Sequence, residues 1–344
     1  MSSGKTIRIV LGAPFDRESL RGGKSPFAKE FLGIIGDMID VPHEMIMIED
    51  QSMESQVKAL RDADILICGT VAPEAVEAAT RLKLIHSTGA GVDHMLEASS
   101  EAIAKKRVPV ANVGGNLSIG VAEHAMGLVL ALAKDIVNRC IALRDDVWDT
   151  HRGLLLGGKT LGIVGLGNTG VALAKMAKAF DMRVIATKRG PVEALKEELG
   201  LSFLGGPGDL KYVLENSDFV VICTPLTKET RGMIGETELK MMKRSAYLVN
   251  VARWSVVQEE SLYRALKEGW IAGAGIDVWA ASPNNPSTPS PLGINKLRNV
   301  VATPHVAGQT DQLVHESART IAANVRRVYE GKAPVNIVDI AKGY

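Results

Sequence analysis

The chain has 344 residues, a length that favours about two domains, each with a sizeable core. Its hydrophobic content of 46%, charged content of 23% and formal net charge of +1 are ordinary for a soluble globular protein. A near-neutral chain without basic blocks gives no reason to expect a nucleic acid or a membrane surface as a partner.

The cysteines and the N-terminal sequence predict the cellular compartment of the protein. Cys68, Cys140 and Cys223 are odd in number, widely spaced and set in apolar surroundings, which predicts buried, reduced thiols. No signal-peptide pattern precedes the first apolar run at 7–11. Other apolar runs, such as 125–133, are too short to span a bilayer. We therefore expect a cytoplasmic protein.

Short apolar runs alternate with helical patterns in the first third of the chain. The runs that favour strands are 7–11, 45–48, 65–68, 84–87 and 108–113. The helical patterns between them are 27–38, 53–60 and 73–80. Such alternation predicts a parallel sheet covered by helices on both faces.

A long helical pattern separates this part from a second alternating series. Residues 118–148 carry Ala, Leu and Val at spacings of three and four, which predicts one long helix linking two domains. The strands predicted after it are 161–164, 183–186, 219–222, 247–251, 272–278 and 300–302. The proline-rich segment 281–292 predicts a loop, and 311–330 predicts an amphipathic helix that could return to pack on the first part.

The most informative motif follows the strand at 161–164. Gly165, Gly167 and Gly170 have the spacing G-x-G-x-x-G, and a helical pattern continues over 171–180. In this order the first glycine permits a tight turn, the second lets backbone approach a pyrophosphate, and the third lets the helix pack on the strand. The helix N-terminus then faces the phosphates. The chain is therefore predicted to bind a dinucleotide.

The tip of the next strand indicates which dinucleotide binds. The strand ends at Thr187, Lys188 and Arg189, where an NAD-binding unit usually carries an acid for the ribose 2′-hydroxyl. Two cations at this place suit a 2′-phosphate, so we predict a preference for NADP(H) and leave NAD(H) open. The alternative is that the two cations belong to an ordinary solvated turn.

Three segments downstream carry side chains suited to carbonyl chemistry. The first is a strand that ends near Arg253, at the edge where open parallel sheets bind ligands. An arginine there can hold a carboxylate through a bidentate pair and polarise a neighbouring carbonyl. The alternative is an exposed arginine in a surface ion pair.

The second and third segments carry Asp277 and His305. Asp277 closes a strand of small residues and either caps the next turn or hydrogen-bonds a nicotinamide amide. His305 follows the last strand, and histidine is the residue best suited to the proton exchange that carbonyl reduction needs near neutral pH. The alternative for His305 is a structural hydrogen-bond donor in a turn.

Together these segments resemble the D-isomer-specific 2-hydroxyacid dehydrogenase family, which includes phosphoglycerate, glyoxylate/hydroxypyruvate, formate and phosphite dehydrogenases. The resemblance covers nearly the whole chain and rests on several motifs that occur in order. These motifs are residues 86–93 (HSTGAGVD), 121–124 (VAEH), 165–170 (GLGNTG), 225–227 (PLT), 250–253 (NVAR), 275–278 (GIDV) and 303–305 (TPH).

The resemblance implies a role for each matching residue. Arg253 would bind the substrate carboxylate and His305 would be the general acid and base. The backbone of Ala90 and Gly91 would hold the same carboxylate, and no metal ion is expected. The residues implied in cofactor binding are Gly165, Gly167, Asn168, Thr169, Gly170, Thr187, Lys188, Arg189, Thr224, Pro225, Ala252, Asp277 and His305.

The resemblance also implies an architecture and a reaction. We expect an α/β protein whose doubly wound Rossmann domain, residues 118–307, binds NADP and is inserted in a smaller flavodoxin-like substrate domain of residues 1–117 and 308–344. A homodimer built through the nucleotide domain and its long helix is implied as well. The expected reaction is hydride transfer between NADP(H) and the 2-keto or 2-hydroxy group of a small carboxylic acid, such as glyoxylate or hydroxypyruvate.

One position departs from the family pattern. Members usually carry a glutamate before the proline that follows the Asp-Val strand, and Ser282 stands there in this chain. A glutamate would raise the pKa of the histidine and fix its ring, whereas Ser282 would only orient the ring of His305 through a hydrogen bond. The departure leaves two alternatives open. One is oxidation of formate without proton transfer, and the other is a catalytically degenerate protein that binds the nucleotide as a regulatory module.

Two further features of the sequence concern substrate specificity. Trp254 stands where the family usually has glycine, so its ring either lies beside the substrate carboxylate or packs the next helix. The basic segment 21–26 is either a lid over the cleft or, more simply, a solvated surface loop.

Overall fold

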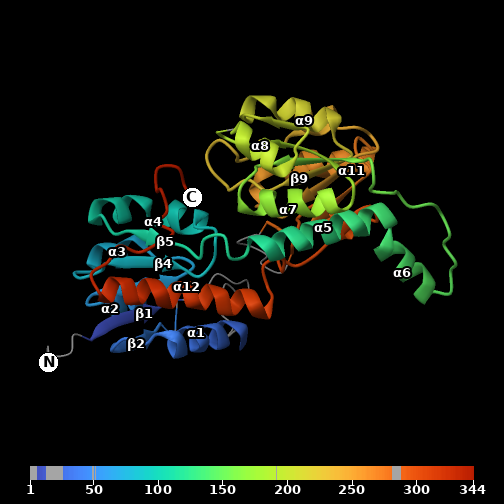
Figure 1. The fold of residues 1–344 in the computed structure, drawn as a ribbon. Helices are drawn as coiled ribbons and strands as arrows, with labels where there is room; N and C mark the ends of the chain where they lie inside the picture. The colour runs from blue at the N-terminus through green and yellow to red at the C-terminus, as the bar shows by residue number, and fades with distance from the viewer. Residues whose placement is uncertain (1–5, 13–25, 49, 51, 191, 281–287) are drawn as a thin grey trace. The chain divides into compact units, whose positions relative to one another are not determined.

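The chain folds into two compact units. The computed structural model describes residues 6–12, 26–48, 50, 52–190, 192–280 and 288–344 (Figure 1). The first unit comprises Met1–Leu117 and Thr310–Tyr344, and the second comprises Ser118–Gln309. The second unit is therefore inserted between the two parts of the first in the sequence.

The first unit contains a five-stranded, wholly parallel sheet. Its strands are β1 (Ile7–Leu11), β2 (His43–Met47), β3 (Ile65–Cys68), β4 (Leu84–Ser87) and β5 (Val110–Ala111). The spatial order β2-β1-β3-β4-β5 is the doubly wound order of flavodoxin-like folds. The last strand is shorter than the predicted 108–113, because only Val110 and Ala111 pair with β4.

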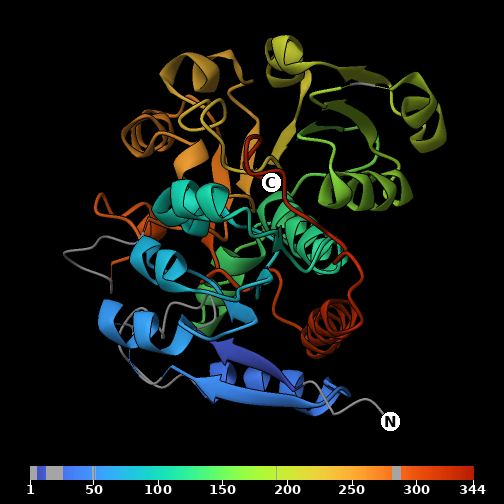
Figure 2. The same cartoon turned by 90° about the vertical axis from the view of Figure 1, so that its left-hand side faces the viewer.

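Helices cover both faces of this sheet. Helices α1 (Pro26–Met38) and α12 (Asp311–Tyr329) pack on one face, and α2 (Met53–Leu60), α3 (Pro73–Ala78) and α4 (Asp93–Lys106) on the other. Figure 2 shows α12, in red, across the strands from α2 and α3. The prediction that the last helix returns to the first part of the chain is confirmed, since α12 packs beside α1.

The second unit contains a seven-stranded parallel sheet. Its strands are β6 (Thr160–Val164), β7 (Arg183–Thr187), β8 (Phe203–Gly205), β9 (Phe219–Ile222), β10 (Tyr247–Asn250), β11 (Gly273–Ile276) and β12 (Val300–Ala302). The order β12-β11-β10-β9-β6-β7-β8 is that of a Rossmann sheet extended by one strand. The chain reverses its winding direction between β6 and β9, where such sheets bind dinucleotides.

Helices also cover both faces of the second sheet. On one face lie α5 (Ser118–Lys134), α7 (Asn168–Ala179) and α8 (Glu193–Leu199). On the other lie α9 (Leu210–Asn216), α10 (Glu236–Met241) and α11 (Glu259–Glu268). The strands are buried on both sides and therefore read in the sequence as continuous apolar runs.

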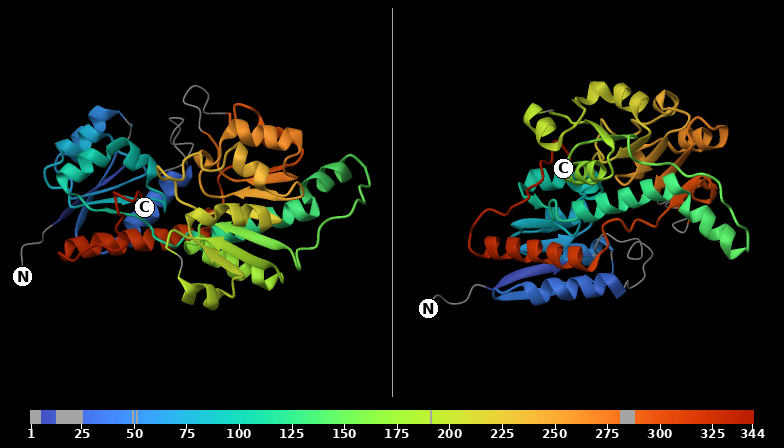
Figure 3. Two further views of the ribbon diagram at one scale, coloured as in Figure 1. Left: turned by 90° about the horizontal axis from the view of Figure 1, so that it is seen from above. Right: turned by 45° about the vertical axis from the view of Figure 1, so that its right-hand side comes forward.

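The prediction of one long helix over 118–148 is wrong. The helix stops at Lys134, Asp135 adopts a φ of 50°, and a second helix, α6 (Ile136–Arg144), follows. A left-handed residue cannot continue a right-handed helix, and α6 buries none of its residues in the chain. Figure 3 shows α6 and the loop after it projecting from the sheet and helices of their unit.

The predicted burial of the cysteines holds for only part of the set. Cys68 is buried, and burial raises the pKa of its thiol to about 12. Cys223 is half-buried, and Cys140 is exposed because it lies on α6. In the described part of the chain, no helix is both long enough and apolar enough to cross a membrane.

Candidate active site

The glycine loop between β6 and α7 is shaped by close backbone contacts. Gly165 has a φ of 100°, and a Cβ there would lie 2.9 Å from the backbone nitrogen of Thr224. At Gly170 a Cβ would lie 2.6 Å from the carbonyl oxygen of Gly165. Neither position accommodates a side chain, whereas Gly167 faces open space. The loop is therefore packed against its own unit on one side and open on the other.

The open side of the loop fits an anionic dinucleotide. Helix α7 begins at Asn168, and no side chain caps its N-terminus, so its free N–H groups and positive dipole end are available to phosphate. Thr169 and Gly170 follow in the first turn of the helix.

Thr224 supplies a second, independent sign of a ligand at this place. It follows β9, with Pro225 next to it, and its methyl group lies where a Cβ on Gly165 would clash. Its hydroxyl oxygen is buried and has no hydrogen-bond partner within the described residues. A buried hydroxyl without a partner is costly, so a bound polar group is expected to complete its hydrogen bonding.

The two cations at the end of β7 have different surroundings. The carbonyl of Thr187 accepts hydrogen bonds from the N–H groups of Gly165 and Leu166, at 3.1 Å and 2.9 Å. Lys188 is half-buried, and its Nζ donates to the carbonyl of Leu166 at 2.9 Å. Arg189 is exposed, and its guanidinium lies 3.7 Å from the Glu229 carboxylate. Lys188 therefore lies against the glycine loop, and Arg189 lies at its solvent side.

Arg253 lies in a turn that a buried asparagine holds. Asn250, 1% exposed, donates from Nδ2 to the carbonyl of Arg253 at 3.0 Å and accepts the N–H of Ala252 at 3.1 Å. The Arg253 guanidinium donates from Nη1 to the carbonyl of Ala252 at 2.9 Å. Asn250 was visible in the sequence motif, but its role as a support for Arg253 was not.

Trp254 packs inside the second unit. Its side chain is buried, and its ring centroid lies 5.5 Å from that of Trp279 in a tilted arrangement. Trp254 therefore belongs to the core of its unit, and its position beside the substrate carboxylate stays a prediction.

Asp277 and His305 belong to one hydrogen-bonded turn. The Asp277 carboxylate accepts the N–H of Val306 at 2.9 Å and that of Ala307 at 3.0 Å. It thus caps the turn that follows β12, and not the turn directly after its own strand as predicted, while contact with a nicotinamide stays a prediction. His305 occupies this turn with a φ of 61°, a left-handed conformation that is costly for any residue but glycine.

Ala90 and Gly91 lie in the first unit, in the loop between β4 and α4. Both residues are exposed. The carbonyl of Ala90 accepts from Asn112 Nδ2 at 2.8 Å, and that of Gly91 accepts from Ser87 Oγ at 3.4 Å. Protein donors thus fix both carbonyls, while the described residues offer no acceptor to the N–H groups of Ala90 and Gly91.

Buried His86 is the penultimate residue of β4, just before the same loop. Its Nδ1 lies 2.8 Å from the carbonyl of Ser87, and its Nε2 lies 3.0 Å from Nδ2 of Asn324 on α12. A carbonyl only accepts and an amide NH₂ only donates, so Nδ1 carries the hydrogen and Nε2 accepts. Burial lowers the pKa of His86 to about 4.

The second unit brings its predicted residues to one edge of one sheet. Strands β10, β11 and β12 are parallel neighbours, and Arg253, Asp277 and His305 follow their carboxyl ends. The glycine loop and Thr224 follow β6 and β9 at the same edge. Ser282 and residues 21–25 lie outside the described residues.

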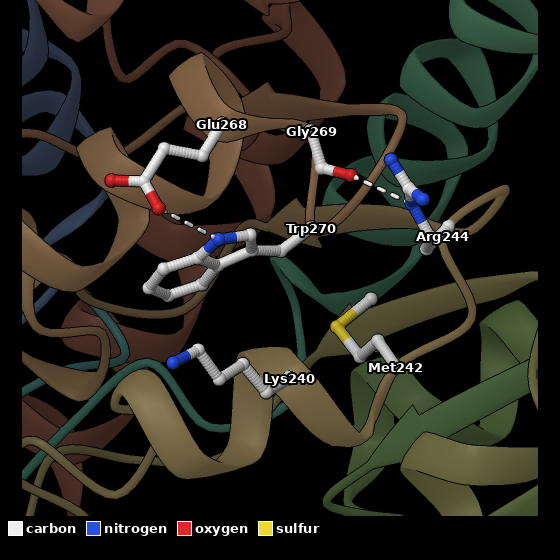
Figure 4. A pocket seen from close by; sticks show the side chains of 6 residues that line it. All are labelled: Lys240, Met242, Arg244, Glu268, Gly269 and Trp270. Atoms are coloured by element: carbon white, nitrogen blue, oxygen red, sulfur yellow. Dashed lines mark hydrogen bonds between the residues drawn. The ribbon is translucent and has the colours of Figure 1, made fainter.

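A surface hollow lies at the opposite edge, near the amino ends of β10 and β11. Figure 4 shows its lining, in which Trp270 donates to Glu268 at 3.0 Å and Lys240 lies 4.5 Å from the centre of the Trp270 ring. Open parallel sheets bind their ligands at the carboxyl edge, so this hollow is apart from the candidate active site.

One group of potential metal ligands stands near α6. Asp135, Asp149 and His151 bring ligand atoms within 4.8 Å of one another. Both ring nitrogens of His151 already face carboxylates, at 2.5 Å from Asp149 and 3.3 Å from Asp135. Arg139, a cation, donates to the carbonyl of His151. We therefore read the group as an ion-pair cluster.

Comparisons with known proteins agree with this geometry. A model of the NAD-binding domain of D-isomer specific 2-hydroxyacid dehydrogenases matches residues 126–307. A glyoxylate reductase from Korarchaeum cryptofilum is 36% identical over 313 residues, which cover 88% of this chain and 91% of that protein. A D-3-phosphoglycerate dehydrogenase from Methanocaldococcus jannaschii is 35% identical over 292 residues, which cover 83% of this chain and 54% of that protein.

A solved structure extends the similarity to both units. The crystal structure of a Thermus thermophilus protein, 31% identical in sequence, matches with a TM-score of 0.75 over 96% of this chain and 100% of that one. The chain therefore belongs to the D-isomer-specific 2-hydroxyacid dehydrogenase family.

Proposed function

We propose that the protein reduces the 2-keto group of a small carboxylate with NADPH. The observation that carries the proposal is the shared carboxyl edge of the second sheet, which bears the glycine loop, Arg253 and His305. Because ligands of open parallel sheets bind at that edge, a dinucleotide on the loop and a substrate beside Arg253 would share one face.

Each polar group has a defined task in this reaction. When bound, the nicotinamide supplies the hydride that reduces C2 of the keto acid. Arg253 binds the carboxylate with its planar fork of N–H donors and polarises the adjacent keto group. His305 donates a proton to the keto oxygen, which becomes the hydroxyl oxygen of the product. The N–H groups of Ala90 and Gly91 bind the substrate carboxylate.

NADPH is the cofactor in this proposal because of the groups at the end of β7. The tip carries Lys188 and Arg189 and no acid that would repel a 2′-phosphate. Lys188 is held against the glycine loop, and Arg189 lies beside it at the solvent side, where its 3.7 Å ion pair with exposed Glu229 is weak.

Glyoxylate is the first substrate to test, since the Korarchaeum cryptofilum relative is a glyoxylate reductase. The assay follows NADPH oxidation with glyoxylate, hydroxypyruvate and longer 2-keto acids, and repeats the series with NADH. We expect turnover with at least one 2-keto acid and a loss of about 10²-fold or more in His305→Gln, since general acid catalysis contributes that much. Tight NADPH binding without turnover of any of these acids would refute the proposal.

We propose further that the protein is a homodimer whose interface includes α6. No residue of α6 is buried within the chain, although the helix and its return loop carry large apolar side chains. Ile141 is 51% exposed, Leu143 56% and Trp148 82%. An exposed apolar surface of this kind is typical of a protein interface, and a second copy of the chain would cover it.

Sedimentation or light scattering at several protein concentrations tests the dimer. The mass should be that of two chains, and Leu143→Asp should shift it towards one chain, because a buried unpaired carboxylate opposes association. Glu229→Gln is a matched surface control and should leave the mass unchanged. A wild-type monomer at all concentrations would contradict the proposal.

A further inference from the structure

His124, on α5, hydrogen-bonds the turn that carries His305. Its Nε2 lies 2.9 Å from Thr303 Oγ1 and 3.5 Å from Asp277 Oδ1. The His124 side chain is 23% exposed and that of Asp277 is 1% exposed. A helix and the ends of two strands, far apart in the sequence, therefore meet at these three side chains.

The hydrogen atoms of this network can be assigned from its geometry. Thr303 Oγ1 lies 2.7 Å from Asp277 Oδ1, and Asp277 accepts two backbone N–H groups, as a carboxylate does. The single hydroxyl hydrogen of Thr303 therefore goes to Asp277, which leaves Oγ1 only the role of acceptor towards His124. Nε2 of His124 must carry a hydrogen, which is true of one neutral tautomer and of the imidazolium.

The network holds a backbone conformation that would otherwise be unfavourable. His305 has a φ of 61°, and its N–H donates to the Thr303 carbonyl at 3.1 Å. The same carbonyl accepts from Trp279 Nε1 at 2.8 Å. A left-handed residue persists only where its surroundings over-determine it, and these bonds together with the Asp277 cap supply that constraint. The direction of the His305 side chain depends on this turn.

We propose that His124 is a positioning residue for His305. Its Nε2–H orients the Thr303 hydroxyl onto Asp277, and Asp277 in turn fixes the N–H groups that follow His305. This inference rests on the proposed function, in which His305 is the proton donor. In this role His124 acts on His305 through the turn.

The position of His124 in the chain explains why its hydrogen bond to Thr303 can affect the turn that carries His305. Helix α5 starts at Ser118, where the chain enters the second unit, and the turn ends shortly before the chain leaves that unit after Gln309. The bond from His124 to Thr303 therefore ties the entering segment to the leaving segment. Without it, the bonds of the turn to Asp277 and Trp279, which follow β11, remain.

The test compares variants that keep or remove the donor. His124→Leu removes it, His124→Gln keeps an N–H at a similar distance from the backbone, and Thr303→Val removes the acceptor. We expect the Leu and Val variants to slow single-turnover reduction of the keto acid about tenfold, equivalent to about 1.4 kcal/mol. The Kd for NADPH should change less than about threefold, since these variants keep Asp277 and the glycine loop.

Two features separate positioning from a general loss of structure. The rate of His124→Gln should be within about threefold of wild type. The double variant should be no slower than Thr303→Val alone, because loss of the Thr303 hydroxyl already breaks its bond to His124 as well as its bond to Asp277. His315→Leu, a change of the same kind at an exposed histidine on α12, should have the wild-type rate. Equal rates for wild type and His124→Leu, or additive losses in the double variant, would overturn the inference.

A second readout does not depend on activity. Hydrogen exchange of the Val306 and Ala307 amides, which Asp277 binds, should be faster in His124→Leu and near the wild-type rate in His124→Gln. Wild-type protein that reduces no 2-keto acid would refute the proposed function. Unchanged exchange in His124→Leu would refute the positioning.

Discussion

Protonation of His86 should destabilise the first unit as the pH falls. The imidazole is 0% exposed, its Nδ1 donates to the Ser87 carbonyl, and its Nε2 accepts from Asn324. A proton on Nε2 would place a positive charge in the core. It would also make the Nε2–H of His86 face the Nδ2–H of Asn324, so that two hydrogen-bond donors would point at each other. The folded unit therefore opposes protonation at this residue, whereas the unfolded chain does not.

The size of the effect follows from the two pKa values. Burial lowers the pKa from 6.5 to about 4, so between these values the unfolded chain binds more protons than the folded one. Stability is thus complete above pH 6.5 and is lost as the pH falls towards 4. The difference corresponds to about 3 kcal/mol in total, of which about 2 kcal/mol is lost between pH 7.5 and pH 5.

The assay must report on the first unit by itself. All four tryptophans, residues 148, 254, 270 and 279, lie in the second unit, so their fluorescence follows that unit. Urea unfolding is therefore followed by far-ultraviolet circular dichroism, and by hydrogen exchange of peptides from β4 and α12. Wild type is compared with His86→Gln, which keeps a polar side chain that does not titrate, and with His315→Gln as a matched exposed control.

The expected result is a steeper pH dependence of the free energy of unfolding for wild type than for His86→Gln. The free energy of unfolding of wild type should fall about 2 kcal/mol more than that of His86→Gln between pH 7.5 and pH 5. The exposed control should follow wild type. Parallel curves for wild type and His86→Gln would show that His86 is not held neutral in the folded unit, and would refute the reasoning.

Three other predictions concern cofactor binding and proton transfer. Arg189→Ser should raise KM for NADPH about tenfold and leave that for NADH within about twofold, because only NADPH carries the 2′-phosphate; equal changes for both cofactors would contradict this. Thr224→Val should weaken NADPH binding severalfold in titrations and leave thermal stability unchanged, since the Thr224 hydroxyl has no partner within the described chain. A lower Tm with unchanged NADPH binding would contradict this prediction. Ser282→Glu should extend keto acid reduction to higher pH, because a carboxylate near His305 would raise the pKa of its imidazole. An unchanged alkaline limb of the pH–rate profile would contradict this prediction.

The sequence by itself determined the architecture and the order of the chemical groups. Parallel strands buried on both faces read as apolar runs, and the runs at 65–68, 84–87, 219–222 and 300–302 match β3, β4, β9 and β12 in their bounds. The glycine spacing after β6 is equally local, because the turn, the phosphate approach and the helix packing all depend on neighbouring residues. Family motifs then ordered Arg253, Asp277 and His305 along one sheet edge.

Local pattern failed where the outcome depended on packing. The apolar periodicity of 118–148 is that of a helix throughout, yet the chain breaks at Asp135, because α5 has a sheet to cover and α6 has none. Cys140 looked like a buried thiol for the same reason. Its apolar neighbours indicate burial only if another element of the chain covers them.

Only the tertiary structure decided which polar groups support the site. His124 and Thr303 are 179 residues apart, and Asn324 reaches His86 across 238 residues. Spacing in the sequence reports on neighbours within a helix turn or a strand and carries no record of such distant pairs. The donor and acceptor of a buried hydrogen bond are chosen when helices and sheet pack together, and it is this packing that brings His124 to the turn of His305.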